Sequence, residues 1–482
     1  MRDAPSGYRV TMKFGGTSVG DAKAISRVAE IVRQARENVL HATPGVTVRQ
    51  VVVVISAMSG VTDALIRAAQ AAVRGEREMV DQIVDRLRRR HVDTLADLIT
   101  DDGERFPLEG ELEALLGYVH SLCRAISILG ELTPRGLDVV SGLGERLSVR
   151  IVAAALRARG MAAQAIEASE LIVTDDCFGT AGPLVDETQK RVQARLFPLL
   201  ESDVVPVITG FIGATKEGIL TTLGRGGSDY SATLLGSSLG SDEIWIWSDV
   251  DGVMTADPRV VPQARTIESL SYAEAAEFSY FGAKVIHPKT ILPAVEREIP
   301  LHILNSFNPQ HPGTRIVAHP PPNGRVVKGI TAIRQVSQIT VEGRGMLGIP
   351  GIAARVFAAV AQEQVNVLMI SQSSSEQNIC FVVPRDASAR TIEALKRAFQ
   401  FDMLRHNVEQ IWNQDDVAIV AVVGEGMKGT VGIASQLFSA LAEQGINVLA
   451  VAQGSSEYNI SLVVAAREVD RAVQAIHVTF GL

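Results

Sequence analysis

The chain has 482 residues, a hydrophobic content of 46% and a formal net charge of -8. That length predicts two to four domains with buried cores. The negative charge argues against a protein that binds nucleic acid, so the basic residues 88–90 and His91 are interpreted as the solvated face of a helix. Cys123, Cys177 and Cys380 lie far apart, which indicates a reducing compartment and neither a zinc site nor a disulfide framework.

Residues 1–8 lack the charged start and apolar run of a secretory signal, and no apolar run reaches the length of a membrane span. We therefore expect a cytoplasmic protein without a membrane partner. The most apolar segment, residues 51–55, is short and β-branched, which is typical of a buried parallel strand.

Residues 8–14 predict a strand, residues 13–20 (KFGGTSVG) a glycine turn and residues 22–36 a helix. This arrangement places backbone amides against phosphate. It is not a Walker A loop, because Lys13 precedes the glycines and no Gly-Lys-Ser/Thr follows. A lysine at the strand end can neutralise charge on a transferring phosphoryl group; the alternative is a surface lysine beside a turn.

The strand at residues 51–55 leads into Ser56, Thr62 and another helix. Two such junctions fit an open α/β sheet, in which ligands lie at the carboxyl ends of the strands. The alternative role for the two hydroxyls is helix capping. Residues 63–128 are mostly charged and helical, with a break near residues 102–103, and predict a helical excursion that covers the site.

Residues 139–147 (VVSGLGERL) predict a further strand, glycine turn and helix, with Glu145 in the first helical turn. The helix dipole favours a carboxylate there, which can also meet a substrate ammonium group, although capping alone explains it as well. Residues 221–233 predict a loop that feeds a helix. Arg225 can bind a carboxylate or phosphate, and Asp229 can meet an ammonium group or order a metal or a lysine, unless the two pair with each other.

Strands alternate with helices up to about residue 303, which predicts a mainly parallel sheet with helices on both faces. Residues 305–325 are rich in proline and predict a linker. Beyond it, residues 346–384 and 427–465 align without a gap at an offset of 81 residues (427 − 346). Each copy has a ferredoxin-like pattern. Its repeated polar loop indicates two related small-ligand sites or one shared at an interface; the alternative is duplicated scaffolding without a ligand.

These motifs closely resemble those of the aspartokinases, and they follow in order over nearly the whole chain at residues 13–19, 141–145, 222–230, 249–252, 255–259 and 282–288. The two C-terminal copies resemble the paired ACT domains of that family. The resemblance implies an α/β amino-acid kinase domain over residues 1–304, a linker over 305–327 and ACT domains over 328–405 and 406–482. It also implies that residues 476–482 return as a strand of the first ACT domain.

The implied reaction is ATP-dependent phosphorylation of the side-chain carboxylate of L-aspartate, the first step towards lysine, threonine and methionine. The resemblance implies that Lys13 stabilises the transferring phosphoryl group and that Asp229 organises this cation. Aspartate would be bound by Arg225 at its α-carboxylate and Glu145 at its ammonium group, with Ser56, Thr62 and Ser228. ATP, with Mg²⁺ bridging its oxygens, would be bound by Lys13, Gly15, Gly16, Thr17, Ser18, Ser248, Asp249, Met254, Asp257, Arg259 and Lys284.

ACT domains imply feedback by an end-product amino acid, with threonine favoured over lysine by the Gln-Ser-Ser-Ser-Glu form of the first loop. The expected effector residues are Gln372, Ser373, Asn378, Gln453 and Asn459. No residues remain for the homoserine dehydrogenase domain of bifunctional relatives, so we expect a monofunctional enzyme that forms a homodimer through its ACT domains. Two alternatives stay open: a sister kinase acting on glutamate or N-acetylglutamate, and an amino-acid sensor without kinase activity.

Overall fold

The computed structural model describes residues 7–37, 39–40, 47–281, 287–321, 324–373, 377–454 and 457–482. The chain forms two compact units. The first comprises Met1–Val253, Glu268–Tyr272 and Val285–Pro320, and the second comprises Met254–Ile267, Ala273–Lys284 and Pro321–Leu482. Two segments that sequence analysis assigned to the kinase domain, residues 254–267 and 273–284, therefore belong to the C-terminal unit.

The first unit is built on an eight-stranded sheet in the order β3-β4-β2-β1-β7-β9-β10-β8. Its pairs are parallel except β9 with β10, which confirms the predicted α/β class. The proline-rich segment predicted as a linker contributes β10 to this sheet. The strands are β1 Tyr8–Phe14, β2 Val48–Ile55, β3 Ala163–Ile166, β4 Val205–Thr209, β7 Glu243–Ser248, β8 Ser269–Ser271, β9 Leu301–Asn305 and β10 Thr314–Val317.

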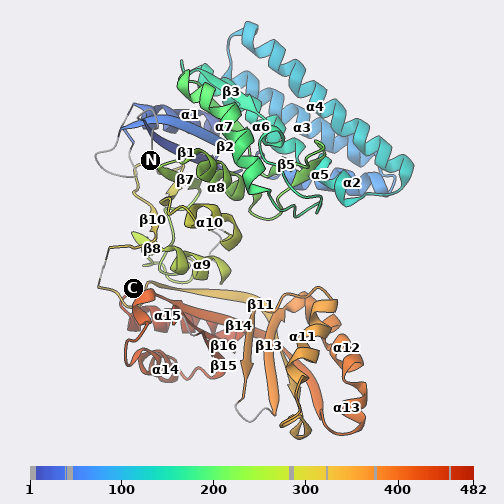
Figure 1. The fold of residues 1–482 in the computed structure, drawn as a ribbon, viewed down its shortest axis with the longest axis vertical. Helices are drawn as coiled ribbons and strands as arrows, with labels where there is room; N and C mark the ends of the chain where they lie inside the picture. Colours follow the sequence, from blue (N-terminus) through green and yellow to red (C-terminus); the bar gives the residue numbers. More distant parts are fainter. Residues whose placement is uncertain are drawn as a thin grey trace. The chain divides into compact units, whose positions relative to one another are not determined.

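Helices cover both faces of this sheet (Figure 1). On one face α1 and α6 contact β2, and a further layer of α3 and α4 packs over them; on the other face α8 contacts β1 and β7. A two-stranded ribbon of β5 (Ile212–Ala214) and β6 (Leu220–Thr222) precedes α8. The helices are α1 Ala22–Arg36, α2 Val61–Val73, α3 Arg77–Leu98, α4 Asp102–Leu129, α5 Pro134–Ser141, α6 Leu143–Arg157, α7 Val185–Glu201, α8 Gly227–Leu239 and α10 Pro288–Val295.

The strand predicted at residues 139–140 is wrong, because these valines lie in α5. Thr133 caps this helix by accepting a hydrogen bond from the Gly136 N–H at 3.1 Å, and Pro134 occupies its first turn. Capping threonine followed by proline is a strong helix start, and it outweighs the β preference of two adjacent valines. The predicted helix that carries Glu145 is confirmed as α6.

The interpretation of residues 88–91 as a solvated face is wrong for its last two residues. Arg90 of α3 donates to the Ser59 carbonyl at 2.7 Å and to the Gly20 carbonyl at 2.8 Å, so it joins two loops. His91 is fully buried, its ring bonds the Leu87 carbonyl at 2.7 Å, and burial lowers its pKa to about 4.

Helix α4 is long and apolar enough to cross a membrane by length and composition, with a hydropathy of 1.3 over its most apolar window. Sequence analysis had found no such segment. The helix contacts α2, α3 and α6 and buries Leu112, Leu116 and Val119 among others. Because a helix packed within a helical layer meets the same criteria, this one helix is weak evidence for a membrane span.

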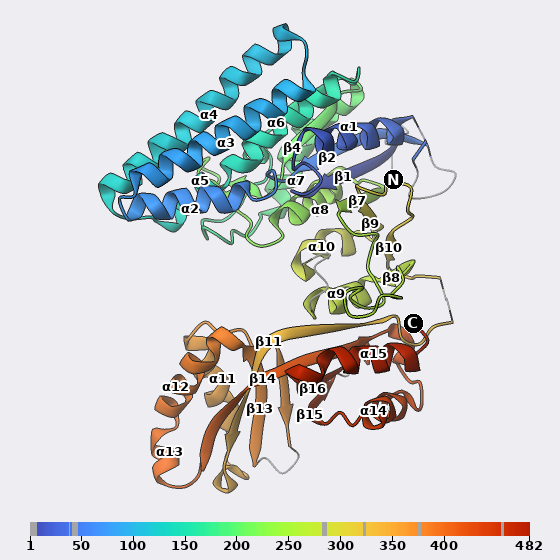
Figure 2. The same cartoon turned by 180° about the vertical axis from the view of Figure 1, so that it is seen from behind.

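The second unit contains a six-stranded antiparallel sheet in the order β12-β13-β11-β14-β16-β15. Figure 2 shows α11, α12 and α13 at one end of the sheet and α14 and α15 at the other. The strands are β11 Gly329–Glu342, β12 Met369–Gln372, β13 Asn378–Pro384, β14 Gln410–Val423, β15 Val448–Gln453 and β16 Asn459–Ala465, and the helices are α9 Tyr272–Tyr280, α11 Ile352–Gln362, α12 Ser388–Ala398, α13 Gln400–Leu404, α14 Ile433–Glu443 and α15 Val469–Thr479.

The two copies share their long strands. β11 and β14 pair from Gly329 opposite Val423 to Glu342 opposite Gln410, so residues 410–414 of β14 lie beside the half of β11 that belongs to the first copy. The expected return of residues 476–482 as a strand is therefore wrong. Residues up to Thr479 lie in α15, which buries Val469, Ala472, Val473 and Ile476 at helical spacing.

Candidate active site

A cavity of about 410 Å³ lies at the carboxyl ends of β1 and β2, where the loops before α2, α6 and α8 meet. All the predicted catalytic and substrate-binding residues line it: Lys13, Ser56, Thr62, Glu145, Arg225, Ser228 and Asp229. Sequence analysis missed Met58, Ser59, Gly60, Asp63 and Phe211. Met58, Ser59 and Gly60 lie between Ser56 and Thr62, and Asp63 directly follows Thr62. The two predicted hydroxyls therefore already marked the loop that contains these four residues.

Lys13 and Asp229 form an ion pair at the base of this cavity, with 2.6 Å between Nζ and Oδ1. Lys13 is fixed between two strands, opposite Val54 of β2 and Ile246 of β7. Asp229 lies in the first turn of α8. Both side chains are largely buried, at 13% and 15% exposed. The two alternatives, a surface lysine and an internal pair between Arg225 and Asp229, are therefore wrong.

Glu145 is buried in the first turn of α6. Its Oε1 accepts a hydrogen bond from the Ala57 N–H at 3.1 Å. Its Oε2 is buried without a hydrogen-bond partner among the described residues. Burial raises the pKa of Glu145 to about 8, against the opposing effect of the Ala57 hydrogen bond. Helix capping alone does not account for this carboxylate, because one of its oxygens remains available to a ligand.

Replacing Glu145 by glutamine should make the ligand-free protein relatively more stable as the pH rises. The pKa of Glu145 is about 8 in the folded protein and 4.5 in the unfolded chain. Between these two pH values the folded state therefore holds one more proton than the unfolded state. The stabilisation from this proton is complete below the lower pKa and is lost as the pH rises through the upper one. The wild-type free energy of unfolding should fall by up to about 1.4 kcal/mol per pH unit between these limits, relative to the variant. Urea unfolding of both proteins across this range measures the difference; a constant difference would contradict the raised pKa.

Arg225 presents a guanidinium group to the cavity and has no hydrogen-bond or ion-pair partner among the residues that the structure describes. Its loop is tied down by Asp138, a buried residue that sequence analysis missed. Asp138 accepts hydrogen bonds from the Thr222 hydroxyl at 2.7 Å and the Thr222 N–H at 3.0 Å. Gly226 follows with φ at 74°, a conformation that favours glycine. The free cation is therefore carried by an anchored loop.

The hydroxyls of Ser56 and Thr62 do not cap α2, since its N-cap is Gly60 and no side chain bonds there. Both residues line the cavity instead, together with Ser228 at the start of α8. Ser228 lies directly against Gly210, where an added Cβ would be 2.6 Å from the serine Oγ. This close contact fixes the start of α8 at the cavity.

The glycine turn after β1 divides into groups that face the cavity and groups that hold the turn. Gly16 lines the cavity, and an added Cβ there would be 2.9 Å from the Ala57 carbonyl oxygen. The Gly15 N–H donates to the Trp247 carbonyl at 3.2 Å. Ser18 is fully buried and its hydroxyl bonds that of Ser306 at 2.8 Å, so its side chain supports the turn, whereas Thr17 is exposed.

The remaining residues predicted to bind nucleotide are divided between the two units. In the first, the Ser248 hydroxyl donates to the Asp249 carboxylate at 3.2 Å. In the second, Asp257 and Arg259 form an exposed ion pair of 2.6 Å, and the Met254 sulfur accepts a hydrogen bond from the Thr266 hydroxyl. Lys284 lies outside the described residues.

A second cavity, of about 310 Å³, lies in the first C-terminal copy. Gln372, at the end of β12, lines it together with Gly348, Gly351 and other residues of the loop before α11. Ser373 follows β12, and Asn378 begins β13 opposite Glu342. Of the predicted effector residues in this copy, the structure places Gln372 in the cavity.

The second copy differs at the corresponding positions. Gln453 ends β15, and the Asn459 amide donates a hydrogen bond to the carboxylate of Glu277 in α9. Burial raises the pKa of Glu277, while this hydrogen bond lowers it. Asn459, which sequence analysis assigned to an effector, therefore binds a carboxylate of the chain itself.

Known proteins match both parts of this architecture. The model of the amino acid kinase family matches residues 9–305, and an ACT domain model matches residues 339–399 and 420–480. The E. coli aspartokinase III structure in complex with aspartate and ADP has a TM-score of 0.80 and 31% identity, over 98% of this chain and 100% of that chain. The chain belongs to the aspartokinases of the amino acid kinase family.

Two further relatives support the assignment to this family. The structure of the E. coli aspartokinase III complex with lysine and aspartate matches with a TM-score of 0.77 and 30% identity, over 98% of this chain and 99% of that chain. A bifunctional aspartokinase/homoserine dehydrogenase of Arabidopsis thaliana is 37% identical over 98% of this chain and 50% of its own length. The chain thus spans about half the length of the first curated aspartokinases that it matches. The expected monofunctional enzyme stays a prediction.

Proposed function

We propose that this protein is an aspartate kinase, which transfers the γ-phosphoryl group of ATP to the side-chain carboxylate of L-aspartate and forms 4-phospho-L-aspartate (EC 2.7.2.4). One observation carries the proposal: the free oxygen of Glu145 and the free guanidinium of Arg225 line the same cavity. Opposite charges on one small cavity match the ammonium and α-carboxylate groups of an amino acid. Aspartate and ADP in the E. coli aspartokinase III complex support this assignment.

The residues present account for the transfer by position and charge. A carboxylate oxygen of aspartate attacks the γ-phosphorus, a new P–O bond forms, the bond to the bridging oxygen breaks, and its electron pair leaves with ADP. The attacking carboxylate is already ionised at neutral pH, so no general base is required. Lys13 neutralises charge on the phosphoryl oxygens, and Asp229 keeps its ammonium group in place.

In this proposal Gly16 and the hydroxyl-rich turn after it bind ATP, and Mg²⁺ would accompany ATP. Among the described residues no group of three histidine, cysteine or carboxylate side chains is positioned to hold a metal ion. Asp63 and Asp229 line the cavity, and Mg²⁺ is typically held by substrate phosphates with one or two protein carboxylates. The ion would supply charge neutralisation on the phosphate oxygens.

Trapping of the acyl phosphate as a hydroxamate tests the proposal. Aspartate, glutamate and N-acetylglutamate are offered separately with ATP. We expect product from aspartate alone, because the acetylated amine carries no charge for Glu145 and glutamate is longer by one methylene group. Equal product from N-acetylglutamate would favour the sister kinase. No product from any substrate, with effector binding intact, would favour the sensor.

We further propose that the reaction serves lysine, threonine and methionine formation and is inhibited by threonine in preference to lysine, with the effector bound beside Gln372. The cavity of about 310 Å³ at this amide supports an amino-acid ligand, whose polar groups an amide can recognise. Because the E. coli aspartokinase III complex contains lysine, the test includes lysine as the alternative effector. A cytoplasmic location and a homodimer through the ACT domains complete the proposal, and light scattering measures the latter.

Replacing Gln372 by alanine should weaken feedback inhibition about tenfold or more while uninhibited turnover changes less than about twofold, because the lost amide leaves effector groups unpaired. Gln453→Ala, at the equivalent glutamine with an offset of 81 residues (453 − 372), tests separately whether the second copy also binds an effector. Inhibition curves with threonine and lysine measure the effect. An unchanged curve for Gln372→Ala would contradict this role.

A further inference from the structure

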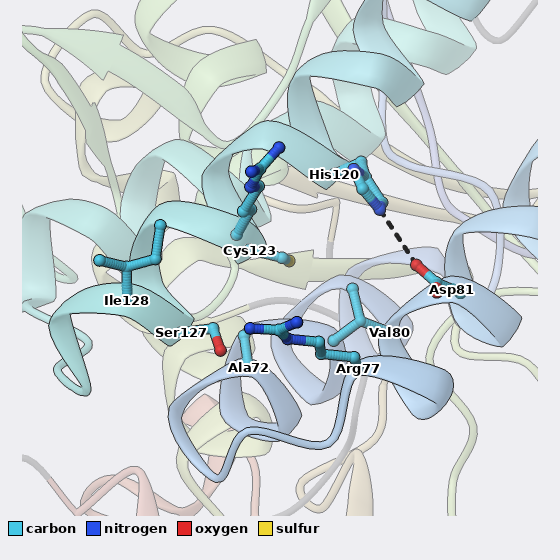
Figure 3. Close-up of a pocket in the computed structure, with 9 residues that line it drawn as sticks. Ala72, Arg77, Val80, Asp81, His120, Cys123, Ser127 and Ile128 are labelled. Carbon is cyan, nitrogen blue, oxygen red and sulfur yellow. Dashed lines mark hydrogen bonds and ion pairs between the residues drawn. The ribbon is translucent and has the colours of Figure 1, made fainter.

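A second open cavity in the first unit, of about 340 Å³, is formed by the helical layer (Figure 3). It lies where α2 ends, α3 begins and α4 ends, and it shares no lining residue with the candidate active site. Helix α2 separates the two, because its first residues line the active-site cavity and Ala72, in its last turn, lines this one. No step of the proposed reaction uses these residues.

Helical spacing brings the lining side chains together. On α4, positions 120, 123, 124 and 127 fall on one face, and on α3 positions 77, 80 and 81 do the same. Figure 3 shows Arg77, Val80 and Asp81 from α3 opposite His120, Cys123 and Ser127 from α4. Val80 and Cys123 are buried and form an apolar floor. Burial raises the pKa of the Cys123 thiol to about 11, so this thiol behaves as an apolar group.

Two cations at this cavity lack a partner within the described part of the chain. The guanidinium groups of Arg77 and Arg124 make no hydrogen bond or ion pair with any residue that the structure describes. Asp81, the carboxylate of the lining, bonds His120 at 3.0 Å and leaves both arginines unpaired. Some arginines of these helices have carboxylate partners, such as Arg88 with Glu113 and Arg105 with Asp102, whereas Arg86 has none among the described residues. Two exposed arginines, without a hydrogen-bond or ion-pair partner among the described residues, thus line one cavity of a protein with a net charge of -8.

We propose that this cavity binds a small organic dianion, a phosphate monoester or a dicarboxylate, between Arg77 and Arg124. Guanidinium groups bind phosphate and carboxylate through paired hydrogen bonds, and two of them match a doubly charged head group. The apolar part of the ligand packs on Val80 and Cys123. A volume of about 340 Å³ is in the range of small-molecule sites.

Calorimetric titration of the full chain with phenyl phosphate, succinate and inorganic phosphate tests this site and distinguishes the two kinds of dianion. The double variant Arg77→Gln/Arg124→Gln removes both charges, and Arg86→Gln is the matched control, because Arg86 is an exposed arginine of α3 outside the cavity. A parallel titration of Lys13→Ala separates any binding in the active site. Unfolding midpoints verify that the variants fold, as expected for exposed side chains.

At least one organic dianion should bind at least about tenfold more weakly to the double variant, with Arg86→Gln within about twofold of wild type and Lys13→Ala still binding. Tighter binding of phenyl phosphate than of inorganic phosphate would verify the apolar floor. Equal affinity of the double variant and wild type would overturn the proposal. Absence of binding by all three anions at about 10 mM would overturn it as well.

Discussion

Replacing Lys13 by alanine is expected to lower kcat by about 10²-fold to 10³-fold, with a much smaller change in effector binding. The Lys13 ammonium lies 2.6 Å from Asp229 at the base of the candidate active site, and it is the cation placed to meet charge on the phosphoryl group. Loss of one preorganised electrostatic group has this magnitude in enzymes. Steady-state rates of hydroxamate formation measure kcat, and calorimetry with threonine and lysine measures effector binding.

Lys23→Ala is the matched control, because Lys23 is an exposed lysine in the first turn of α1. It should retain wild-type kcat within about twofold, as surface substitutions usually do. Removal of Lys13 also leaves the Asp229 carboxylate partly buried without its cation, so the unfolding midpoint of Lys13→Ala must be compared with wild type. A folded Lys13→Ala protein with unchanged kcat would refute the catalytic role, and parallel loss of effector binding would refute the separation of the two sites.

Replacing Glu145 by glutamine is expected to lower kcat/KM for aspartate by about 30-fold to 5000-fold. The amide keeps the shape of the side chain and removes the charge that attracts the substrate ammonium. Loss of one partner of a buried charge pair costs about 2–5 kcal/mol, which corresponds to a loss of this size. A loss below about threefold would contradict the assigned role.

The same variant should remove a pH dependence. In the free protein the pKa of Glu145 is about 8, and only the ionised form attracts an ammonium group. Affinity for aspartate should therefore rise with pH, by up to tenfold per unit below about pH 8, and level off above it. Glutamine does not titrate, so its profile should be flat over this interval. A sloping profile in both proteins would assign the dependence to another group.

Much of this protein follows from short stretches of sequence. The strand at residues 8–14, the helix at residues 22–36 and the helix that starts near Arg225 have local signals, namely apolar runs, glycine turns and caps, and the structure confirms them. The internal repeat predicted two copies of one pattern, and the structure buries Ile352 and Val356 of α11 and their equivalents Ile433 and Leu437 of α14. Motif order was enough to indicate the family and the residues around its cavity.

Other features depend on contacts between distant residues. Lys13 and Asp229 are 216 positions apart (229 − 13), and their pairing exists because β1 and α8 pack together. Arg90 lies in a charged run, yet it donates hydrogen bonds to the carbonyls of Gly20 and Ser59 and so holds two loops together. The raised pKa of Glu145 comes from burial by other elements. Local sequence determined the elements and the chemistry of their ends, whereas burial and long-range pairing, which depend on the whole fold, decided the charge state and partner of each group.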